Sequence, residues 1–345
     1  MTPAPISQET DIIIIGAGPV GLFTVFQCGM LGMRCHVIDA LDHTGGQCAA
    51  LYPEKPIYDI PGLPVASGQE LVDRLAEQAA PFDPVFHLGQ QVSGLKAVGD
   101  AAWHVTTADG TALLARAVII AGGVGAFAPK RPPLDGIGRF EGQPEGRGVQ
   151  YAVIDPGAYQ GRRVVIAGGG DSAVDWAVEL APVAASVQVV HRRERFRAAP
   201  GSVSRLHELA AAGAVELVVP GQLAGLEGAG NSLSAVLVRQ GDEDRRLEAD
   251  ALLAFFGLSQ SLGPITDWSL GLDKNRIVAD PTTAQTSLAG VYAVGDIAAY
   301  PHKLKLILTG FSEAAFAAHA AFNRVFPDRA LHFEYSTTKG LPGGA

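Results

Sequence analysis

The chain has 345 residues, of which 48% are hydrophobic and 18% are charged, a composition typical of a soluble globular protein. This length exceeds what one ordinary hydrophobic core organises, so we expect two domains. The formal net charge of −9 argues against general nucleic-acid binding. No apolar run reaches membrane-spanning length, and residues 1–10 lack the pattern of a secretion signal, so we expect a cytoplasmic protein.

A strand, a glycine-rich turn and a helix follow one another near the N-terminus. Residues 11–15 contain four consecutive isoleucines and predict a buried parallel strand, and residues 19–31 predict a helix. Gly16, Gly18 and Gly21 lie between and within these elements in the spacing Gly-x-Gly-x-x-Gly. In this setting glycines let the backbone approach a pyrophosphate at the helix N-terminus.

The next predicted strand, residues 34–38, ends at an acid, Asp39. An acid at this place accepts hydrogen bonds from a ribose hydroxyl, so strand, turn, helix and acid together predict a dinucleotide site. The alternative is a tight strand-to-helix turn that holds no ligand. The three cysteines have neither Cys-x-x-Cys nor zinc-finger spacing, which predicts free thiols and no metal site.

The rest of the first half alternates between loops and short elements. Residues 45–62 open with a second glycine pair, which suggests that the chain again passes close to the cofactor, and continue into a rigid, proline-rich loop. Apolar spacing predicts a helix over residues 68–82. Residues 84–120 predict short strands with a hairpin turn at Asp109-Gly110, and the glycine- and proline-rich residues 124–160 predict a linker between domains.

The opening pattern then repeats with a different strand end. A buried strand over residues 163–167 runs into Gly-x-Gly-x-x-Ala at residues 168–173, and the next strand, residues 186–190, is followed by Arg192 and Arg193 instead of an acid. Arginine suits a 2′-phosphate. Charge-assisted hydrogen bonds of about 1.5–3 kcal/mol each would favour NADP over NAD by about 3–6 kcal/mol, before screening. The alternative is a solvated basic edge.

The last third returns to the theme of the first. A helix over residues 204–212 precedes a β-meander, in which residues 242–246 form an exposed turn. A strand over residues 290–294 ends at Asp296, which is suited to bind a cofactor hydroxyl or to cap the following helix. That helix covers residues 309–325 and presents an apolar face of Phe311, Ala315, Ala318 and Phe322.

Together these motifs give the chain a family resemblance. It resembles the thioredoxin-reductase-like ferredoxin–NADP⁺ reductases, among the two-dinucleotide-binding-domain flavoproteins. The carriers are Gly-Gly-Gln at 45–47, Leu-Tyr-Pro-Glu-Lys-Pro at 51–56, Gly-Gly-Gly-Asp-Ser-Ala at 168–173, His-Arg-Arg at 191–193, Ser-Leu-Gly-Pro-Ile at 261–265, Gly-Asp-Ile at 295–297 and Tyr-Ser-Thr-Thr at 335–338. The resemblance implies an α/β fold with two Rossmann-like domains of the three-layer ββα type. It places the FAD domain at residues 1–125 plus 288–345 and the NADP domain at residues 126–287.

The resemblance also implies the residues of both sites. The FAD site would comprise Gly16, Gly18, Pro19, Gly21, Asp39, Gly46, Gln47, Tyr52, Val92, Phe127, Asp296 and Thr337. The NADP site would comprise Gly168, Gly170, Asp171, Ser172, Ala173, His191, Arg192, Arg193 and Arg197. Tyr52 would stack on one face of the flavin ring. Tyr335, next to Ser336, would cover the other face from the partner subunit of a homodimer.

The implied activity is transfer of electrons between NADPH and ferredoxin or flavodoxin through FAD, with no acid or base residue required. Residues 150–170 contain no cysteine, whereas a thioredoxin reductase needs a redox pair there. A reductase of quinones or of an external disulfide protein, and a non-catalytic redox-sensing flavoprotein, are the alternatives. Residues 302–305 are a candidate ferredoxin-docking patch; the alternative is two ordinary solvated lysines.

Overall fold

The computed structural model describes residues 8–332 and 336–340 and divides the chain into two compact units. The first unit comprises Met1–Phe127 together with Gln260–Ala345, and the second comprises Ala128–Ser259. The sequence placed the return to the first domain at residue 288, whereas residues 260–287 already belong to the first unit. They do so because their apolar side chains are buried in its core: Leu262, Ile265, Trp268, Leu270, Ile277 and Ala279.

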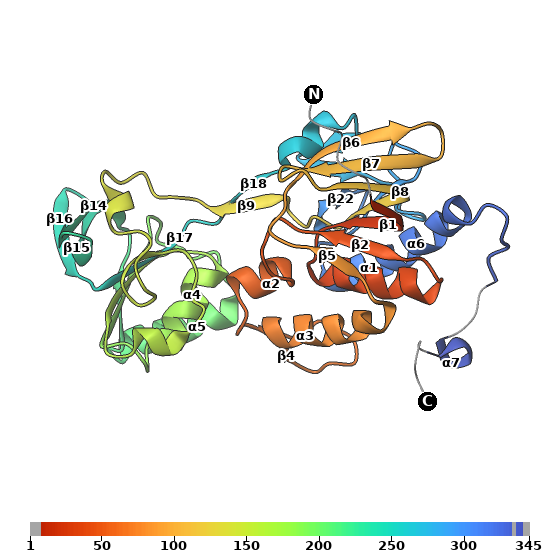
Figure 1. The fold of residues 1–345 in the computed structure, drawn as a ribbon. Helices are drawn as coiled ribbons and strands as arrows, with labels where there is room; N and C mark the ends of the chain where they lie inside the picture. The colour runs from red at the N-terminus through yellow and green to blue at the C-terminus, as the bar shows by residue number, and fades with distance from the viewer. Residues whose placement is uncertain (1–7, 333–335, 341–345) are drawn as a thin grey trace, which may run out of the picture. The chain divides into compact units, whose positions relative to one another are not determined.

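A seven-stranded sheet forms the centre of the first unit (Figure 1). Five strands run parallel in the order β5, β2, β1, β8, β21, and β8 also pairs antiparallel with β7, which pairs with β6. The bounds are β1 Gln8–Ile15, β2 Cys35–Ile38, β5 Val85–His87, β6 Val92–Val98, β7 Ala102–Thr107, β8 Ala112–Ile120 and β21 Val291–Ala293. The β7–β8 connection contains the predicted turn at Asp109-Gly110, which is confirmed.

Alternate side chains of β1 enter two different cores. Ile12 and Ile14 are buried on the face covered by helices α1 and α6. Ile13 and Ile15 are buried on the opposite face with Trp103 of β7. The helices of this unit are α1 Pro19–Met30, α2 Gly46–Leu51, α3 Gly68–Ala79, α6 Ile307–Val325 and α7 Ser336–Lys339. The unit therefore has three layers, helices, parallel sheet and antiparallel strands, and the ββα prediction is confirmed.

The buried face of α6 differs from the prediction. Its buried residues are Gly310, Glu313, Ala314, Ala317, Ala318, Ala321, Phe322 and Val325. Small residues face α1 and allow the two helices to approach closely, whereas Phe311 and Ala315 are only partly buried. Phe311 instead contacts Phe23 of α1, with the ring centroids 4.8 Å apart. No helix in the described part of the chain, α6 included, is long and apolar enough to cross a membrane.

The second unit repeats the same architecture on a smaller scale. Its parallel sheet has the strand order β10, β17, β11, β12, β13, and a separate antiparallel sheet contains β14, β15 and β16. The strands are β10 Gly148–Gln150, β11 Arg163–Gly168, β12 Ser186–Val190, β13 Val215–Val218, β14 Gln222–Ala229, β15 Ser232–Gln240, β16 Glu243–Glu248 and β17 Ala251–Phe255. The helices are α4 Asp171–Leu180 and α5 Pro200–Ala211. Two Rossmann-like units are therefore present, as predicted.

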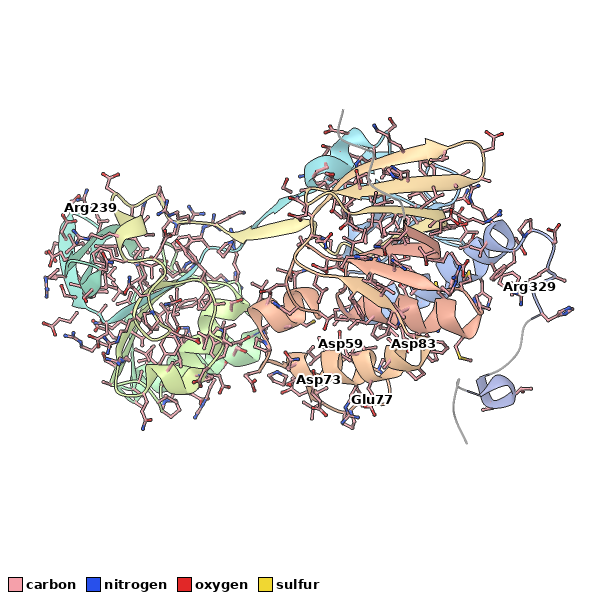
Figure 2. The ribbon with its side chains drawn as sticks, viewed as in Figure 1. Asp59, Asp73, Glu77, Asp83, Arg239 and Arg329 are labelled. Carbon is pink, nitrogen blue, oxygen red and sulfur yellow. The ribbon has the colours of Figure 1, made fainter. Side chains whose placement is uncertain are left out.

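The charged run at residues 242–246 is mostly strand, so its prediction as an exposed turn is wrong. β16 pairs with β15 from Gln240↔Glu243 to Ala235↔Glu248. The run is compatible with a strand because its charges pair across the sheet: Arg239 Nε lies 2.7 Å from Asp244 Oδ1. Figure 2 shows Arg239 at the outer side of this meander. Leu247 is the one residue of β16 that is buried.

Two short strands carry the chain between the units. β9 Ala126–Pro129 pairs with β18 Leu258–Ser261. The predicted linker of residues 124–160 is too long, because most of it belongs to the second unit. Arg131 and Tyr151 both bind Glu141, at 2.6 Å and 2.5 Å, and anchor this stretch.

Candidate functional site

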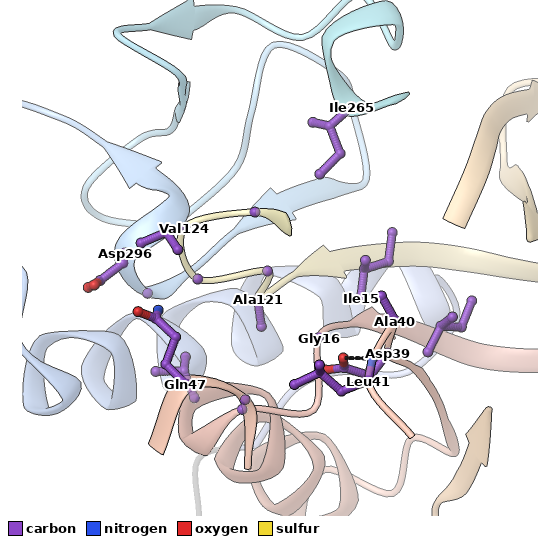
Figure 3. A pocket seen from close by; sticks show the side chains of 18 of the residues that line it. Ile15, Gly16, Asp39, Ala40, Leu41, Gln47, Ala121, Val124, Ile265 and Asp296 are labelled. Carbon is purple, nitrogen blue, oxygen red and sulfur yellow. Dashed lines mark hydrogen bonds between the residues drawn. The ribbon is translucent and has the colours of Figure 1, made fainter. Parts of the chain in front are cut away.

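A cavity of about 390 Å³ opens at the carboxyl ends of the parallel strands of the first unit (Figure 3). Its lining begins with the residues that end these strands, Ile15 of β1 and Ile38 of β2, and those that follow β8 and β21, Ala121 and Gly295. Ligands of open α/β sheets bind at this edge. The cavity therefore lies where the sequence places a dinucleotide.

Packing explains two of the three glycines in the first turn. A Cβ at Gly16 would lie 2.4 Å from the carbonyl oxygen of Ala121, and a Cβ at Gly21 would lie 1.9 Å from that of Gly16. Gly18 is different, because the nearest atom to a Cβ there would be Gly46 Cα at 3.9 Å. Gly16 and Gly21 are thus required by strand–helix packing, whereas Gly18 leaves room for a ligand.

The N-terminus of α1 is available to an anion. Gly18 precedes the helix and gives no side-chain cap, Pro19 occupies the first turn, and this turn contains no acid. The free amide groups and the helix dipole favour a negatively charged group such as a pyrophosphate. Gly46 lies against this turn: a Cβ there would be 3.1 Å from Gly18 Cα. The prediction that the second glycine pair approaches the same site is thereby supported by geometry.

Asp39 is held at the end of β2 by two backbone amides. Its Oδ2 accepts a hydrogen bond from the Ala17 amide at 2.6 Å, and its Oδ1 accepts one from the Leu41 amide at 2.8 Å. Burial raises the pKa of Asp39 and outweighs these hydrogen bonds, which lower it. A carboxylate has about four acceptor sites, so Asp39, which lines the cavity, retains acceptor capacity for a ribose hydroxyl.

The structure brings most of the predicted FAD residues to this cavity. The predicted residues that line the cavity are Gly16, Gly18, Pro19, Asp39, Gly46, Gln47, Tyr52, Val92 and Asp296. Gly21 does not line the cavity but packs against Gly16 in the glycine turn. Thr337 is exposed on α7 and does not line the cavity. Tyr335 lies outside the described residues, as do the side chains of Phe127 and Ser336.

Cys48 and Tyr52 interact within the cavity wall. The Cys48 thiol donates to the Tyr52 hydroxyl oxygen at 3.7 Å, and Cys48 is 2% exposed. Burial raises the pKa of both the Cys48 thiol and the Tyr52 phenol. Both groups therefore stay protonated near neutral pH.

Sequence reasoning missed one side of the cavity. Leu262, Pro264, Ile265 and Trp268 line it from the short helix η4 (Gly263–Asp267) and its neighbours. The domain boundaries predicted from the sequence place the Ser-Leu-Gly-Pro-Ile motif in the second domain, away from this cavity. Lys305 and Ile307 also line the cavity, and the lysine pattern at 302–305 was the available signal.

The second glycine turn is tied to the loop after β12. A Cβ at Gly169 would lie 2.2 Å from the His191 ring, whereas one at Gly170 would meet nothing within 4 Å. The Gly169 carbonyl accepts a hydrogen bond from the Arg197 amide at 2.7 Å. Asp171, in the first turn of α4, accepts one from the Ala199 amide at 2.9 Å. Asp171 therefore organises the loop, and the loop in turn lies beside the open Gly170.

The arginines predicted to bind phosphate are exposed. Arg192, Arg193 and Arg197 form no ion pair with a carboxylate of the described residues. The His191 ring stacks on Phe196 with a centroid distance of 5.3 Å. Burial lowers the pKa of His191, and the charges of Arg192 and Arg197 lower it further. The remaining predicted residues belong to the turn and first helical turn: Gly168, Ser172 and Ala173.

The proposed docking patch at residues 302–305 is not supported as a pair of surface lysines. The side chain of Lys303 is 1% exposed and forms an ion pair with Glu313. It is therefore unavailable to a partner. Lys305 is exposed but lines the cavity.

The fold and the two glycine turns define a class of protein with two Rossmann-like nucleotide-binding units in one chain. Residues 10–321 match the pyridine nucleotide-disulphide oxidoreductase family, and the chain belongs to that family. Ferredoxin–NADP reductases of Paramagnetospirillum magneticum and Rhodospirillum rubrum are 59% and 57% identical to it. The alignments cover 98% and 97% of this chain and 99% and 97% of the relatives.

The fold is shared with solved thioredoxin reductases. Those of Lactococcus lactis and T. acidophilum each superpose with a TM-score of 0.76 at 23% identity. In both cases 92% of this chain and 99% of the other chain are covered. The thioredoxin-reductase-like architecture predicted from the sequence is thus confirmed.

Proposed function

We propose that this protein is an FAD-dependent ferredoxin–NADP⁺ reductase that exchanges electrons between NADPH and ferredoxin or flavodoxin. One observation carries the proposal. The same chain has one glycine turn beside a half-buried acid, Asp39, and a second beside exposed arginines, Arg192 and Arg193. This combination supports one dinucleotide with free ribose hydroxyls and another with a 2′-phosphate.

The cavity of the first unit fits FAD. Gly18 provides space next to the uncapped N-terminus of α1, which suits the pyrophosphate, and Asp39 retains acceptor sites for the ribose. Asp296 and Gln47 line the cavity as further polar groups (Figure 3). Tyr52, which stays protonated, supplies the aromatic surface on which the flavin ring would stack.

FAD held by the residues of this cavity would supply the chemistry that the reaction needs, acceptance of a hydride from NADPH and donation of single electrons to an iron–sulfur acceptor. The protein's residues bind and orient the two nucleotides. In the second unit, Gly170 and the start of α4 suit the pyrophosphate of NADP, and Arg192, Arg193 and Arg197 suit its 2′-phosphate. Residues 128–259 contain no cysteine, which argues against a disulfide relay in this unit.

The finer parts of the proposal concern assembly and location. We expect a cytoplasmic homodimer in which Tyr335 covers the second face of the flavin from the partner subunit. Phe127, Ser336 and Thr337 complete the predicted flavin surroundings. The 59% identity to a ferredoxin–NADP reductase over 98% of this chain supports the proposed activity, and the position of Tyr52 in the cavity wall supports its place at the first face of the flavin.

The test is an electron-transfer assay on the purified protein. We expect a yellow FAD-containing protein that oxidises NADPH faster than NADH and reduces cytochrome c much faster once ferredoxin is added. A protein without bound FAD would contradict the proposal. Rapid NADPH oxidation without stimulation by ferredoxin or flavodoxin would instead favour quinones or an external disulfide protein as acceptor.

A further inference from the structure

A buried ion pair lies behind the cavity wall of the first unit. Lys303 and Glu313 have side chains that are 1% and 4% exposed. By contrast, the side chains of the surface pair Arg74–Glu70 in the same unit are 56% and 45% exposed. Two buried charges are costly to desolvate, and a buried pair is seldom explained by stability alone. The segments that this pair joins are therefore of interest.

Glu313 binds two separate parts of the wall. Its Oε2 accepts a hydrogen bond from the Gly295 amide at 2.7 Å. Its Oε1 accepts hydrogen bonds from the Lys303 ammonium and the Tyr300 hydroxyl. Burial and the neighbouring carboxylate raise the pKa of Tyr300, so its hydroxyl remains a donor. One carboxylate on α6 thus organises donors from residues 295–303.

Both parts lead directly into the cavity. Gly295 precedes Asp296, which lines the cavity (Figure 3). Lys303 precedes Lys305 and Ile307, which also line it. A shift of either segment would therefore move polar groups of the cavity wall.

Close packing leaves these segments little freedom to adjust. A Cβ at Gly310 of α6 would lie 3.2 Å from Gly295 Cα and 2.4 Å from Val20 Cγ2. Val20 belongs to the first turn of α1 and lines the cavity as well. The start of α1, the Gly295–Asp296 turn and α6 therefore meet at one point, directly beside the buried carboxylate.

We propose that Glu313, held by Lys303, is a positioning residue that sets the Gly295–Asp296 turn and the Lys305–Ile307 segment for binding of FAD. The inference rests on the proposed function only in taking FAD as the ligand. Glu313 acts through the backbone amide of Gly295 and does not line the cavity.

Two double variants separate the role of the acceptor from that of the charge. Glu313→Gln with Lys303→Met removes both charges but keeps a side-chain oxygen for the Gly295 amide. Glu313→Met with Lys303→Met also removes both charges and leaves that amide, together with the Tyr300 hydroxyl, without the acceptor. Apolar replacement of a whole buried pair is commonly tolerated by the fold, so both variants can be compared as folded proteins.

FAD affinity of the deflavinated protein, the visible spectrum of bound FAD and thermal unfolding are the measurements. We expect the Gln/Met protein to bind FAD within about threefold of wild type and the Met/Met protein about tenfold more weakly with an altered spectrum, because a buried donor is left unpaired. Affinity of the second unit for NADP⁺ should not change. Arg74→Gln, which breaks the exposed pair, is the matched control and should leave all readouts unchanged.

Wild-type FAD affinity and spectrum in the Met/Met protein would overturn the inference, and so would its failure to fold while the Gln/Met protein folds. Failure of the Met/Met protein alone to fold would mean that the Glu313 acceptor is needed for folding and not specifically for FAD binding. A wild-type protein that binds no FAD would refute the proposed function itself, so the two failures are distinguishable.

Discussion

The two units place different groups at the same point of the same fold. Asp39 directly follows β2, and His191 directly follows β12. Asp39 is held by two backbone amides, whereas His191 leads into exposed arginines. Burial favours the neutral form of each group, because it raises the pKa of the Asp39 carboxyl and lowers the pKa of the His191 imidazole.

This contrast shows how one architecture could treat two nucleotides differently. The acid predicted to bind the nucleotide in the first unit, Asp39, is already held in place by two backbone amides. The arginines of the second unit are solvated and must lose side-chain freedom on binding. The first site thus suits a nucleotide that stays bound, and the second suits one that exchanges.

The largest expected effect concerns the two kinds of glycine in the first turn. We expect Gly21→Ala to abolish FAD binding and to destabilise the apoprotein by about 2–3 kcal/mol, because its Cβ would meet a backbone carbonyl. We expect Gly18→Ala to keep the free energy of unfolding within about 0.5 kcal/mol of wild type. It should weaken FAD binding about tenfold or more, because the added methyl group occupies only space in the cavity.

Urea unfolding of the apoprotein and FAD titration measure both effects. Gly170→Ala is the counterpart in the second unit, where a Cβ would meet nothing within 4 Å, and it should leave FAD binding unchanged. FAD affinity of Gly18→Ala equal to wild type would show that no pyrophosphate contacts this turn.

Local signals predicted both turns, because strand, glycines, helix and strand-end residue follow one another within a short stretch. Long-range packing decided what was missed. Trp268 reaches the first cavity only because its segment returns to that unit's core. Lys303 looked like a surface cation, and only its pairing with Glu313 explains its burial. The strand at 243–248 was hidden because two of its charges are paired with residues distant in the sequence, Arg245 with Glu216 and Arg246 with Glu227.

The exposed arginines after β12 are expected to determine the preference for NADPH over NADH. We expect Arg192→Gln with Arg193→Gln to lower the ratio of kcat/KM for NADPH to that for NADH by about 100-fold. This is near the lower end of two charge-assisted hydrogen bonds, because both side chains are exposed and screened. FAD content should not change.

Steady-state kinetics with both nucleotides check this ratio. Arg205→Gln is the matched control, because Arg205 is an exposed arginine of the same unit that already lies 2.8 Å from Glu208. An unchanged ratio in the double variant would mean that the two arginines do not contact the 2′-phosphate. They would then be a solvated basic edge, the alternative that the sequence leaves open.

His191 and Asp39 are expected to make the free energy of unfolding depend on pH in opposite directions, with a small magnitude. The folded-state pKa of His191 is lowered, so the unfolded chain binds more protons between that pKa and about 6.5. The stability it contributes is present above about pH 6.5 and is lost as pH falls through the folded pKa. Asp39 is opposite: its pKa is raised, so its contribution is present below its unfolded pKa and is lost as pH rises through the folded one.

Unfolding of the apoprotein in urea at pH 7.5 and 5.5 tests this contrast. Acidification should destabilise wild type more than His191→Gln, by a few tenths of a kcal/mol because solvent screens the partly exposed ring. Asp39→Asn should shift the pH dependence in the other direction over the acid range between the unfolded and folded pKa of Asp39, because it removes a group that gains protons on folding. Identical pH dependence of wild type and His191→Gln would mean that His191 does not titrate in this interval. The two strand ends would then differ in exposure and hydrogen bonding, and the contrast in charge would rest on the arginines alone.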